Sequence, residues 1–344
     1  MKRIGVLTGG GDAPALNAVL RAITRYANNE GISVLGFQEG WKGIIEGIPM
    51  PLDWSNTDNI IGEGGTILGS SRTNPFKREG GVEGIIENFR RYDLDAFIAI
   101  GGDDTLGVAN RLYLEKGFPI IGVPKTIDND LSATDFTFGF DTAVNRAVEA
   151  IDSLVTTARS HRRVMVVEIM GRHAGWIAAY AGIASGADVV LVPERPFSID
   201  SVAETLKKNR YQGKLYNIVA IAEGATLAEG ESFVTLTSDK DEFGHVRLGG
   251  IAEELSKELQ KRTGFESRHV VLGHLQRGGS PSAFDRILGT RLGLKAYELA
   301  RDGQFGKMVA LKGNEIVAVS LQEGVGKLKL LHEEYLRIID TFTA

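Results

Sequence analysis

Three polar segments each follow a short apolar run, and their residue types suit the binding of phosphate and of magnesium. The first, residues 9–12, has the sequence Gly-Gly-Gly-Asp and precedes an apolar-periodic stretch over 15–26. Glycine lets backbone N–H groups approach an anion at a helix N-terminus, where the helix dipole also favours negative charge. Glycine also serves tight strand-to-helix turns for steric reasons alone, and the segment lacks the Lys-Ser/Thr ending of a P-loop. Both interpretations of residues 9–12 stay open.

The second segment, residues 101–105, places two adjacent carboxylates, Asp103 and Asp104, beside two glycines that leave room for phosphate. A carboxylate there can hold Mg²⁺, directly or through water, and the ion would bridge phosphate oxygens. The alternative is a helix cap, in which Asp104 or Thr105 satisfies the first N–H groups of the next helix. One acid would suffice for capping, so the pair favours a magnesium–phosphate site.

The third segment, residues 124–130, contains Asp128 and Asp130 two positions apart. In an extended backbone these two side chains point the same way. One can then act as general base toward a sugar hydroxyl while the other orients it. An acidic turn would explain the end of this segment, but it explains the preceding Lys125 and Thr126 less well.

Two basic clusters flank later apolar runs. Arginine presents a planar fork that binds phosphate in a bidentate manner. Each arginine alone could be a solvated surface residue, but together, at the ends of strands, they indicate a site for a phosphorylated substrate. The six histidines include no pair at metal-ligand spacing, so we expect no transition-metal site. The clusters are Arg162, Arg163 and Arg172 around one run, and Arg268, His274 and Arg277 around another.

These segments need strands to position them, and the sequence supplies near-continuous apolar runs separated by helix-like stretches. Such runs indicate parallel strands covered on both faces, and ligands bind at the carboxyl ends of strands in these sheets. At least eight strands suit two sheets better than one, with a break near residue 139. We therefore predict an α/β fold with mostly parallel sheets. Seven of the runs precede the turns that concern us here: 4–7, 96–100, 119–123, 163–169, 189–192, 217–222 and 270–272.

Composition narrows the class of protein. The chain has 344 residues, 43% hydrophobic and 24% charged, with a net charge of −5. That balance gives no reason to expect nucleic acid or an anionic membrane as partner. The absence of cysteine excludes disulfides, thiolate metal sites and a cysteine nucleophile. Residues 1–7 show no signal-peptide pattern, and 175–186 is too short for a membrane span. We expect a cytoplasmic enzyme.

Together these motifs resemble the phosphofructokinases along nearly the whole chain. The resemblance implies two Rossmann-like three-layer α/β domains with the active site in the cleft between them. The expected domains are 1–139 plus about 276–305, for the phosphoryl donor and Mg²⁺, and about 140–275 plus 306–344, for fructose 6-phosphate. The segments that carry the resemblance stand in family order: residues 9–12 with Asn17, 71–73, 101–103, 126–130, 170–172, 223–224 and 273–279.

The resemblance also implies a chemical role for each matched residue, in the transfer of a phosphoryl group to the 1-hydroxyl of fructose 6-phosphate. Asp128 resembles the general base for that hydroxyl, with Asp130 beside it and Thr126 in contact with the substrate. Asp103 resembles the residue that serves Mg²⁺. Arg172 resembles the cation that steadies the moving phosphoryl group.

The remaining matched residues concern binding. Gly11 and Arg72 resemble contacts to the donor phosphates. Arg163 and Arg268 match positions that, in the family, reach the substrate of a neighbouring subunit, so we expect a homo-oligomer, tetramer or dimer, whose active site is completed by assembly. The residues that resemble fructose 6-phosphate contacts are Met170, Gly171, Arg172, Glu223, His274 and Arg277.

Two departures from the ATP-using pattern predict pyrophosphate as the donor. Asp104 and Lys125 stand where ATP-using bacterial members usually have glycine, and both resemble the pyrophosphate-dependent members. A carboxylate at Asp104 would repel an ATP α-phosphate: like charges ~4 Å apart cost roughly 1 kcal/mol in water and ~4 kcal/mol at an effective dielectric near 20. Lys125 supplies a point charge that pyrophosphate can use. We therefore assign both residues to donor binding and catalysis.

Several alternatives remain. An ATP-dependent 6-phosphofructokinase is the first of them. A lipid or NAD kinase shares a Gly-Gly-Asp loop but lacks the runs at 170–172 and 273–279. A non-catalytic sugar-phosphate-binding subunit would not need the matched acids, and a dinucleotide oxidoreductase needs a glycine fingerprint that residues 9–11 do not match. Regulation by nucleotides is not expected, because Trp54 stands where an effector-binding arginine would be, although Arg21 and Arg25 lie four apart on the first helix.

Overall fold

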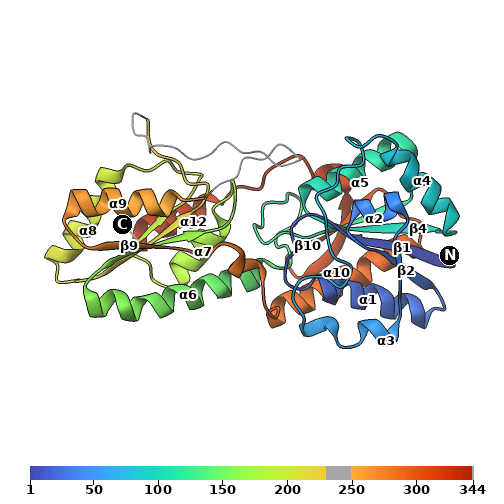
Figure 1. The fold of residues 1–344 in the computed structure, drawn as a ribbon, viewed down its shortest axis with the longest axis horizontal. Helices are drawn as coiled ribbons and strands as arrows, with labels where there is room; N and C mark the ends of the chain where they lie inside the picture. The colour runs from blue at the N-terminus through green and yellow to red at the C-terminus, as the bar shows by residue number, and fades with distance from the viewer. Residues whose placement is uncertain (230–248, 343–344) are drawn as a thin grey trace.

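The structure, a computed structural model, describes residues 1–229 and 249–342, which form two α/β lobes lying end to end (Figure 1). The first lobe is built on a seven-stranded sheet with the order β11-β10-β5-β4-β1-β2-β3. Only its two edge strands, β3 and β11, pair antiparallel to their neighbours. The strands are β1 Arg3–Thr8, β2 Ser33–Phe37, β3 Pro49–Leu52, β4 Ala96–Gly101, β5 Ile120–Pro124, β10 Lys307–Lys312 and β11 Glu315–Ser320.

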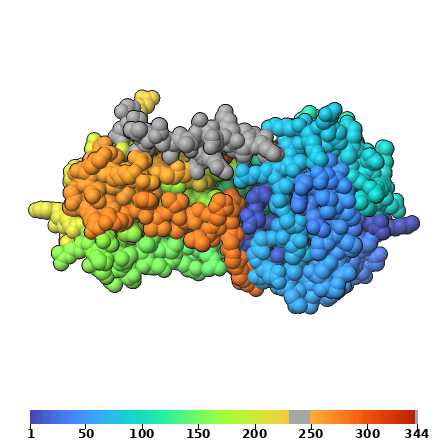
Figure 2. Space-filling view, viewed as in Figure 1, coloured from blue at the N-terminus to red at the C-terminus, as the bar shows by residue number. Residues whose placement is uncertain are grey.

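The second lobe is built on a four-stranded, wholly parallel sheet with the order β7-β8-β6-β9. Figure 2 shows the two lobes in contact, with the chain just after β9 (orange) crossing from one to the other. No helix within the described ranges has the length and apolar character to cross a bilayer. The strands of this sheet are β6 Val164–Ile169, β7 Val189–Leu191, β8 Asn217–Ala222 and β9 Ser267–Val271.

Helices cover both faces of each sheet, so each lobe has three layers. In the first lobe, α1 and α10 pack on one face and α2, α4 and α5 on the other. Their bounds, with those of the shorter helices of this lobe, are α1 Leu16–Asn29, α2 Trp41–Glu46, α3 Trp54–Thr57, η1 Ile60–Gly62, α4 Gly81–Arg91, α5 Asp103–Lys116, α10 Ala283–Arg301 and α11 Leu321–Gly324.

In the second lobe, α6, α7 and α12 pack on one face of the sheet and α8 and α9 on the other. A short 3-10 helix, η2, follows β9 and leads back toward the first lobe. The bounds are α6 Phe140–His161, α7 Trp176–Ala184, α8 Ile199–Tyr211, α9 Ile251–Thr263, η2 Gly273–Arg277 and α12 Glu333–Phe342.

The predicted fold class is confirmed, and β4 shows why its apolar run indicated a doubly covered strand. Ile98 and Ile100 are buried against α1 and α10, whereas Phe97 and Ala99 are buried in the core beneath α2, α4 and α5. A strand with apolar neighbours on both faces needs no polar alternation. The sequence therefore identified seven of the strands. It missed the interior strands β2 and β10 and the edge strands β3 and β11, of which β3 contains Pro49 and Pro51.

One expected domain assignment is wrong in part. We expected 306–344 to join the second lobe, but β10 pairs in parallel with β5, and β11 with β10, so both belong to the first sheet. Met308, Val309 and Ala310 of β10 are fully buried in the cores of the first lobe, which explains the placement. Helix α11 packs on α5 in the same lobe. Helix α12 lies in the second lobe, where it packs on α7.

The closest helix pair in the first lobe, α1 against α10, depends on small residues. A Cβ atom added at Gly293 of α10 would lie 2.8 Å from the carbonyl oxygen of Val19 and 2.9 Å from Cβ of Ala22. Such distances are shorter than van der Waals contact, so a side chain at Gly293 would push the two helices apart. Glycine is required here by the approach of the α1 backbone.

We expect Gly293→Ala to lower the free energy of unfolding by about 1–3 kcal/mol, because it overpacks the contact between α1 and α10. The matched control is Gly107→Ala in α5, where an added Cβ meets nothing within 4 Å. The control should raise the free energy of unfolding by about 0.5–1 kcal/mol through the loss of glycine's flexibility. Urea denaturation at fixed protein concentration measures both. Equal effects of the two substitutions would contradict this packing.

Candidate active site

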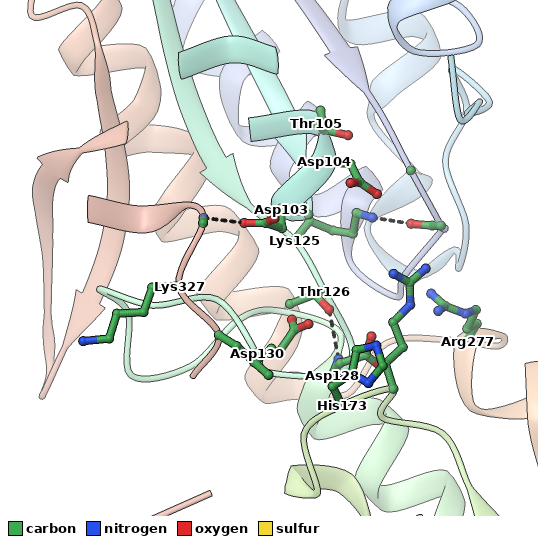
Figure 3. A pocket seen from close by; sticks show the side chains of 16 residues that line it. Asp103, Asp104, Thr105, Lys125, Thr126, Asp128, Asp130, His173, Arg277 and Lys327 are labelled. Carbon is green, nitrogen blue, oxygen red and sulfur yellow. Dashed lines mark hydrogen bonds between the residues drawn. The ribbon is translucent and has the colours of Figure 1, made fainter. Parts of the chain in front are cut away.

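A cavity of about 330 Å³ lies between the lobes, where the carboxyl ends of β4 and β5 meet the loop after β6 (Figure 3). Parallel sheets offer ligands this position. The structure brings together in its lining a large part of the residues predicted from the three polar segments and the basic clusters. These are Gly11, Asp103, Asp104, Lys125, Thr126, Asp128, Asp130, Arg172 and Arg277.

Two cations from separate loops hold the first glycine-rich loop. The Lys125 ammonium, at the end of β5, donates a hydrogen bond to the carbonyl oxygen of Gly11. Arg277 donates from Nη1 to the carbonyl oxygen of Asp12 at 3.0 Å. A Cβ atom at Gly11 would lie 2.8 Å from Arg277 Nη1. The lack of a side chain at Gly11 therefore avoids a clash with Arg277. It also allows the loop to lie beside two positive charges.

Lys125 is the buried cation of the cavity, with only 3% of its surface exposed. Burial, together with the charge of Arg277, lowers the pKa of Lys125 to about 7, although Asp128, Asp12 and Asp130 act in the opposite direction. Desolvation makes the ammonium form costly in the free protein. A bound polyanion would restore that charge, so Lys125 suits a phosphate ligand better than a neutral one.

Asp128 and Asp130 lie in the loop after β5, below Lys125 in Figure 3. Asp128 is 4% exposed, and its Oδ1 is buried without a hydrogen-bond partner among the described residues. Its backbone N–H donates to Thr126 Oγ1 at 3.0 Å, which orders the turn. A buried carboxylate oxygen that lacks a donor is a strong acceptor for a substrate hydroxyl. This geometry fits a general base.

Asp130 shares the same buried charge environment. Burial and the neighbouring Asp128 raise the pKa of Asp130 to about 6. Two carboxylates in a buried site resist simultaneous ionisation, because like charges disfavour the charged form. Asp130 can therefore hold a proton at a higher pH than an ordinary aspartate does.

The loop after β6 brings Arg172 into the cavity from the second lobe. Arg172 has φ 51°, a left-handed conformation that is costly for a residue other than glycine. Glu223 stabilises this turn, because its Oε1 accepts hydrogen bonds from the N–H groups of Gly171 (3.3 Å) and Arg172 (3.0 Å). A Cβ atom at Gly224 would lie 1.8 Å from the Arg172 carbonyl oxygen. The Glu-Gly pair at 223–224 thus shapes the arginine loop.

Other predicted site residues do not line this cavity. Arg163, just before β6, and Arg268 of β9 both pair with Glu266, at 2.9 Å and 2.6 Å. His274 lies in a separate hollow beside the exposed side chain of Leu275. The residues of the prediction that lie outside the cavity lining are Arg72, Arg163, Met170, Gly171, Glu223, Arg268 and His274.

The cavity also contains residues that the sequence did not identify. His173 follows Arg172 directly, and Gly326, Lys327 and Leu328 come from the segment after α11. The Gly326 N–H donates to Asp103 Oδ1 at 2.9 Å. No strand end or glycine-rich turn of the predicted kind marks 326–328, so nothing in the sequence placed this late segment beside residues more than 200 positions earlier.

The acidic edge of the cavity fits Mg²⁺ bound together with a phosphate ligand. Asp103 and Asp104 occupy the first turn of α5. The backbone N–H of Gly326, just after α11, fixes one carboxylate oxygen of Asp103. In the described ranges, no group of three or more His, Cys, Asp or Glu side chains could hold a metal by itself. Mg²⁺ commonly uses one or two carboxylates and takes its other ligands from phosphates and water. The residues present suit that mode.

The arginines of α1 are engaged within the first lobe. Arg21 and Arg25 both lie near the carboxylate of Asp58, and the Arg25 guanidinium lies 3.9 Å from the ring centre of Trp54. These contacts partly neutralise and cover the two cations. They give no indication of an open anion site on this helix.

Comparison with known proteins extends the geometric argument. A sequence profile described as phosphofructokinase matches residues 3–300. The pyrophosphate–fructose 6-phosphate 1-phosphotransferase of Amycolatopsis methanolica is 55% identical over 341 residues, 99% of each chain. An ATP-dependent 6-phosphofructokinase of Streptomyces coelicolor is 51% identical, over 95% of this chain and 96% of its own. The solved phosphofructokinase of Saccharomyces cerevisiae is 31% identical with a TM-score of 0.79, over 94% of this chain and 45% of its own.

The raised pKa of Asp130 predicts a pH-dependent gain in stability from Asp130→Asn. A carboxyl whose folded pKa lies above its unfolded value stabilises the fold at low pH, and this contribution is lost as pH rises through about 6. Removing the charge should therefore raise the free energy of unfolding by about 1 kcal/mol more at pH 8 than at pH 5. Denaturant unfolding at both pH values tests this. A gain that is the same at both would refute the charge conflict.

Proposed function

The chain belongs to the phosphofructokinase family, and on that premise we propose that it transfers a phosphoryl group from pyrophosphate to the 1-hydroxyl of fructose 6-phosphate. The products are fructose 1,6-bisphosphate and phosphate, and the reaction is reversible and uses Mg²⁺. Relatives from Amycolatopsis methanolica and Dictyoglomus thermophilum, 55% and 50% identical, are named pyrophosphate–fructose 6-phosphate 1-phosphotransferase. The observation that carries the proposal is that Asp104 and Lys125 line one cavity together with Asp128.

The donor assignment rests on the charges at the acidic edge of the cavity. Asp104 lies one residue beyond Asp103 on α5 and points toward the end of Lys125 in Figure 3. A nucleoside triphosphate would have to bring its α-phosphate past this carboxylate, which costs up to ~4 kcal/mol at an effective dielectric near 20. Pyrophosphate has no α-phosphate and no nucleoside, so it avoids this repulsion and keeps the attraction to Lys125.

An ATP-dependent 6-phosphofructokinase is the second candidate, because an ATP-dependent relative is 51% identical to this chain. That value is close to the 55% of a pyrophosphate-dependent relative, so overall identity discriminates weakly between the donors. The local charge at Asp104 is the stronger criterion.

The proposed mechanism divides the chemistry between the lobes. Asp128 accepts the proton of the sugar 1-hydroxyl, and Asp130 orients that hydroxyl and shares the negative charge. As the hydroxyl oxygen attacks the phosphoryl group, Arg172 stabilises the charge on the transferring oxygens, and Lys125 stabilises the departing phosphate. Asp103 would hold Mg²⁺ together with the donor, and the bound ion would supply further charge neutralisation. Gly11 and Arg72 contact the donor phosphates, and Thr126 contacts the sugar.

The sugar phosphate binds mainly to the second lobe in this proposal. Arg163, just before β6, and Arg268, in β9, lie together around Glu266, and β9 is an edge strand with exposed residues. The two arginines reach the substrate of a neighbouring subunit in a cytoplasmic homo-oligomer, tetramer or dimer. The other proposed fructose 6-phosphate contacts are Met170, Gly171, Arg172, Glu223, His274 and Arg277.

The donor assay compares fructose 1,6-bisphosphate formation with Mg-pyrophosphate and with Mg-ATP. We expect a higher kcat/KM with pyrophosphate. We also expect Asp104→Gly to raise kcat/KM for ATP by roughly tenfold or more, because the repulsion of the α-phosphate is removed. Asp93→Gly is the matched control: Asp93 is an exposed acid with φ 51°, where glycine fits and the charge lies outside the cavity. A higher kcat/KM of the parental enzyme with ATP would refute the assignment.

A second test concerns the general base. Asp128→Ala should reduce kcat by on the order of 10²–10⁴-fold, the usual contribution of a positioned base. Binding of fructose 6-phosphate, measured by calorimetry, should stay within a few-fold of the parental value, because the phosphate is held by arginines elsewhere. Retention of near-parental turnover would show that Asp128 is not the base.

A further inference from the structure

A late segment of the chain, residues 325–332, connects α11 in the first lobe to α12 in the second and contacts two loops of the cavity on the way. We call it the connecting segment. The Gly326 N–H donates to the Asp103 carboxylate at 2.9 Å. The Lys329 N–H donates to the carbonyl oxygen of Asp130 at 2.8 Å. The Leu331 N–H donates to Glu194 Oε1 at 2.9 Å. The segment is thus hydrogen-bonded to the magnesium-serving loop, the general-base loop and the second lobe.

Lys329 is the residue of the connecting segment whose side chain makes the most hydrogen bonds. Its ammonium donates to Asn129 Oδ1 at 2.9 Å and to the carbonyl oxygens of Thr134 and Asp135 at 3.0 Å each. Three oxygens match the three N–H groups of an ammonium. On the side of the second lobe, Trp176 Nε1 donates to the Lys329 carbonyl oxygen at 2.8 Å. Trp176 begins α7, the helix that follows the Arg172 loop.

Asn129 needs this support. It lies between the two catalytic carboxylates, is fully buried, and has φ 52°, in the left-handed region. Its Oδ1 accepts hydrogen bonds from the backbone N–H of Thr137 at 3.2 Å and from Lys329. Asparagine adopts the left-handed region more readily than most residues other than glycine, and the hydrogen bonds to its buried Oδ1 fix the turn that it forms here. Lys329 therefore forms a hydrogen bond to the side chain of Asn129 through its ammonium and another to the backbone of Asp130 through its N–H. The two bonds lie on either side of the peptide between Asn129 and Asp130, which sets the orientation of both residues.

We propose that Lys329 is a positioning residue for the general base: it fixes the turn at Asn129 and thereby aims the carboxylates of Asp128 and Asp130 into the cavity. Lys329 does not line that cavity; it lines a separate hollow of about 470 Å³ formed with Trp176, Tyr180 and Lys312. Its effect on turnover is therefore indirect. The proposal rests on the proposed function, because it assigns Lys329 to the same reaction.

Loss of the ammonium should affect chemistry more than binding. A reacting group displaced by about 1 Å can cost on the order of 10²-fold in rate. The phosphate-binding arginines do not contact Lys329 in the described structure, so substrate affinity depends on other loops. The expected result is a selective loss of kcat.

The test uses Lys329→Met in the full-length enzyme, which removes the ammonium and keeps the aliphatic stem and the backbone hydrogen bonds. We expect kcat to fall on the order of tenfold to hundredfold in both directions, with KM for each substrate within about threefold. Lys312→Met is the matched control: Lys312 lines the same hollow, but its ammonium pairs with the Asp135 carboxylate at 3.3 Å and not with the general-base loop. Its kcat should stay within twofold.

A second variant separates positioning from folding. Lys329→Ala should regain a measurable part of its kcat, several-fold or more, when n-propylamine is added, because the amine can enter through the hollow that Lys329 lines. A kcat within twofold of the parental value in Lys329→Met would overturn the proposal. The proposal would also be overturned by a loss of kcat in Lys329→Ala that n-propylamine does not restore, or by an equal loss of kcat in Lys312→Met. Either result would mean that Lys329 has a structural role only. If the parental enzyme is inactive with pyrophosphate, that result would instead refute the proposed function alone.

Discussion

The hydrogen bond from the Lys125 ammonium to the Gly11 carbonyl oxygen is the interaction on which the cavity depends. It joins the end of β5 to the glycine-rich loop after β1, and it places one buried positive charge among several carboxylates. Burial penalises an isolated charge, so this arrangement is most favourable when a polyanion and its metal ion complete it. Burial first, and then the neighbouring charges of Arg277 and Asp128, lower the pKa of Lys125 and raise the pKa of Asp130 in the free protein.

The fold supplies the rigidity that this balance needs. Parallel strands buried on both faces end at one edge, and the loops that follow them carry the phosphate-facing residues. The second lobe adds Arg172 on a left-handed turn that Glu223 and Gly224 hold in place. Neither lobe alone contains both the carboxylates of 128–130 and this arginine. The reaction therefore depends on how the lobes meet, and residues 325–332 join them at that point.

The sequence predicted the parts of this structure that local patterns encode. Apolar runs identified seven of the strands, and glycine and acid clusters at their ends placed Asp103, Asp128 and their neighbours in one predicted site, whose residues line one cavity. Local patterns carry no information on which distant segment completes a sheet or a cavity. The placement of β10 beside β5, and of Lys327 and Lys329 beside the loops of the first lobe, follows from long-range packing, so it could not be predicted. Glu223 was identified, but its hydrogen bonds to the arginine turn became visible only in three dimensions.

The central claim is that the carboxylate of Asp104 leaves room for a diphosphate and not for a nucleotide. Its most direct measurement is a crystal structure of the enzyme with fructose 6-phosphate and Mg²⁺, soaked with imidodiphosphate or with a non-hydrolysable ATP analogue. The account predicts imidodiphosphate within hydrogen-bond distance of Lys125, in line with the sugar 1-hydroxyl, and no ordered nucleotide in that cavity. A triphosphate in line with the hydroxyl, with its α-phosphate beside Asp104, would contradict it.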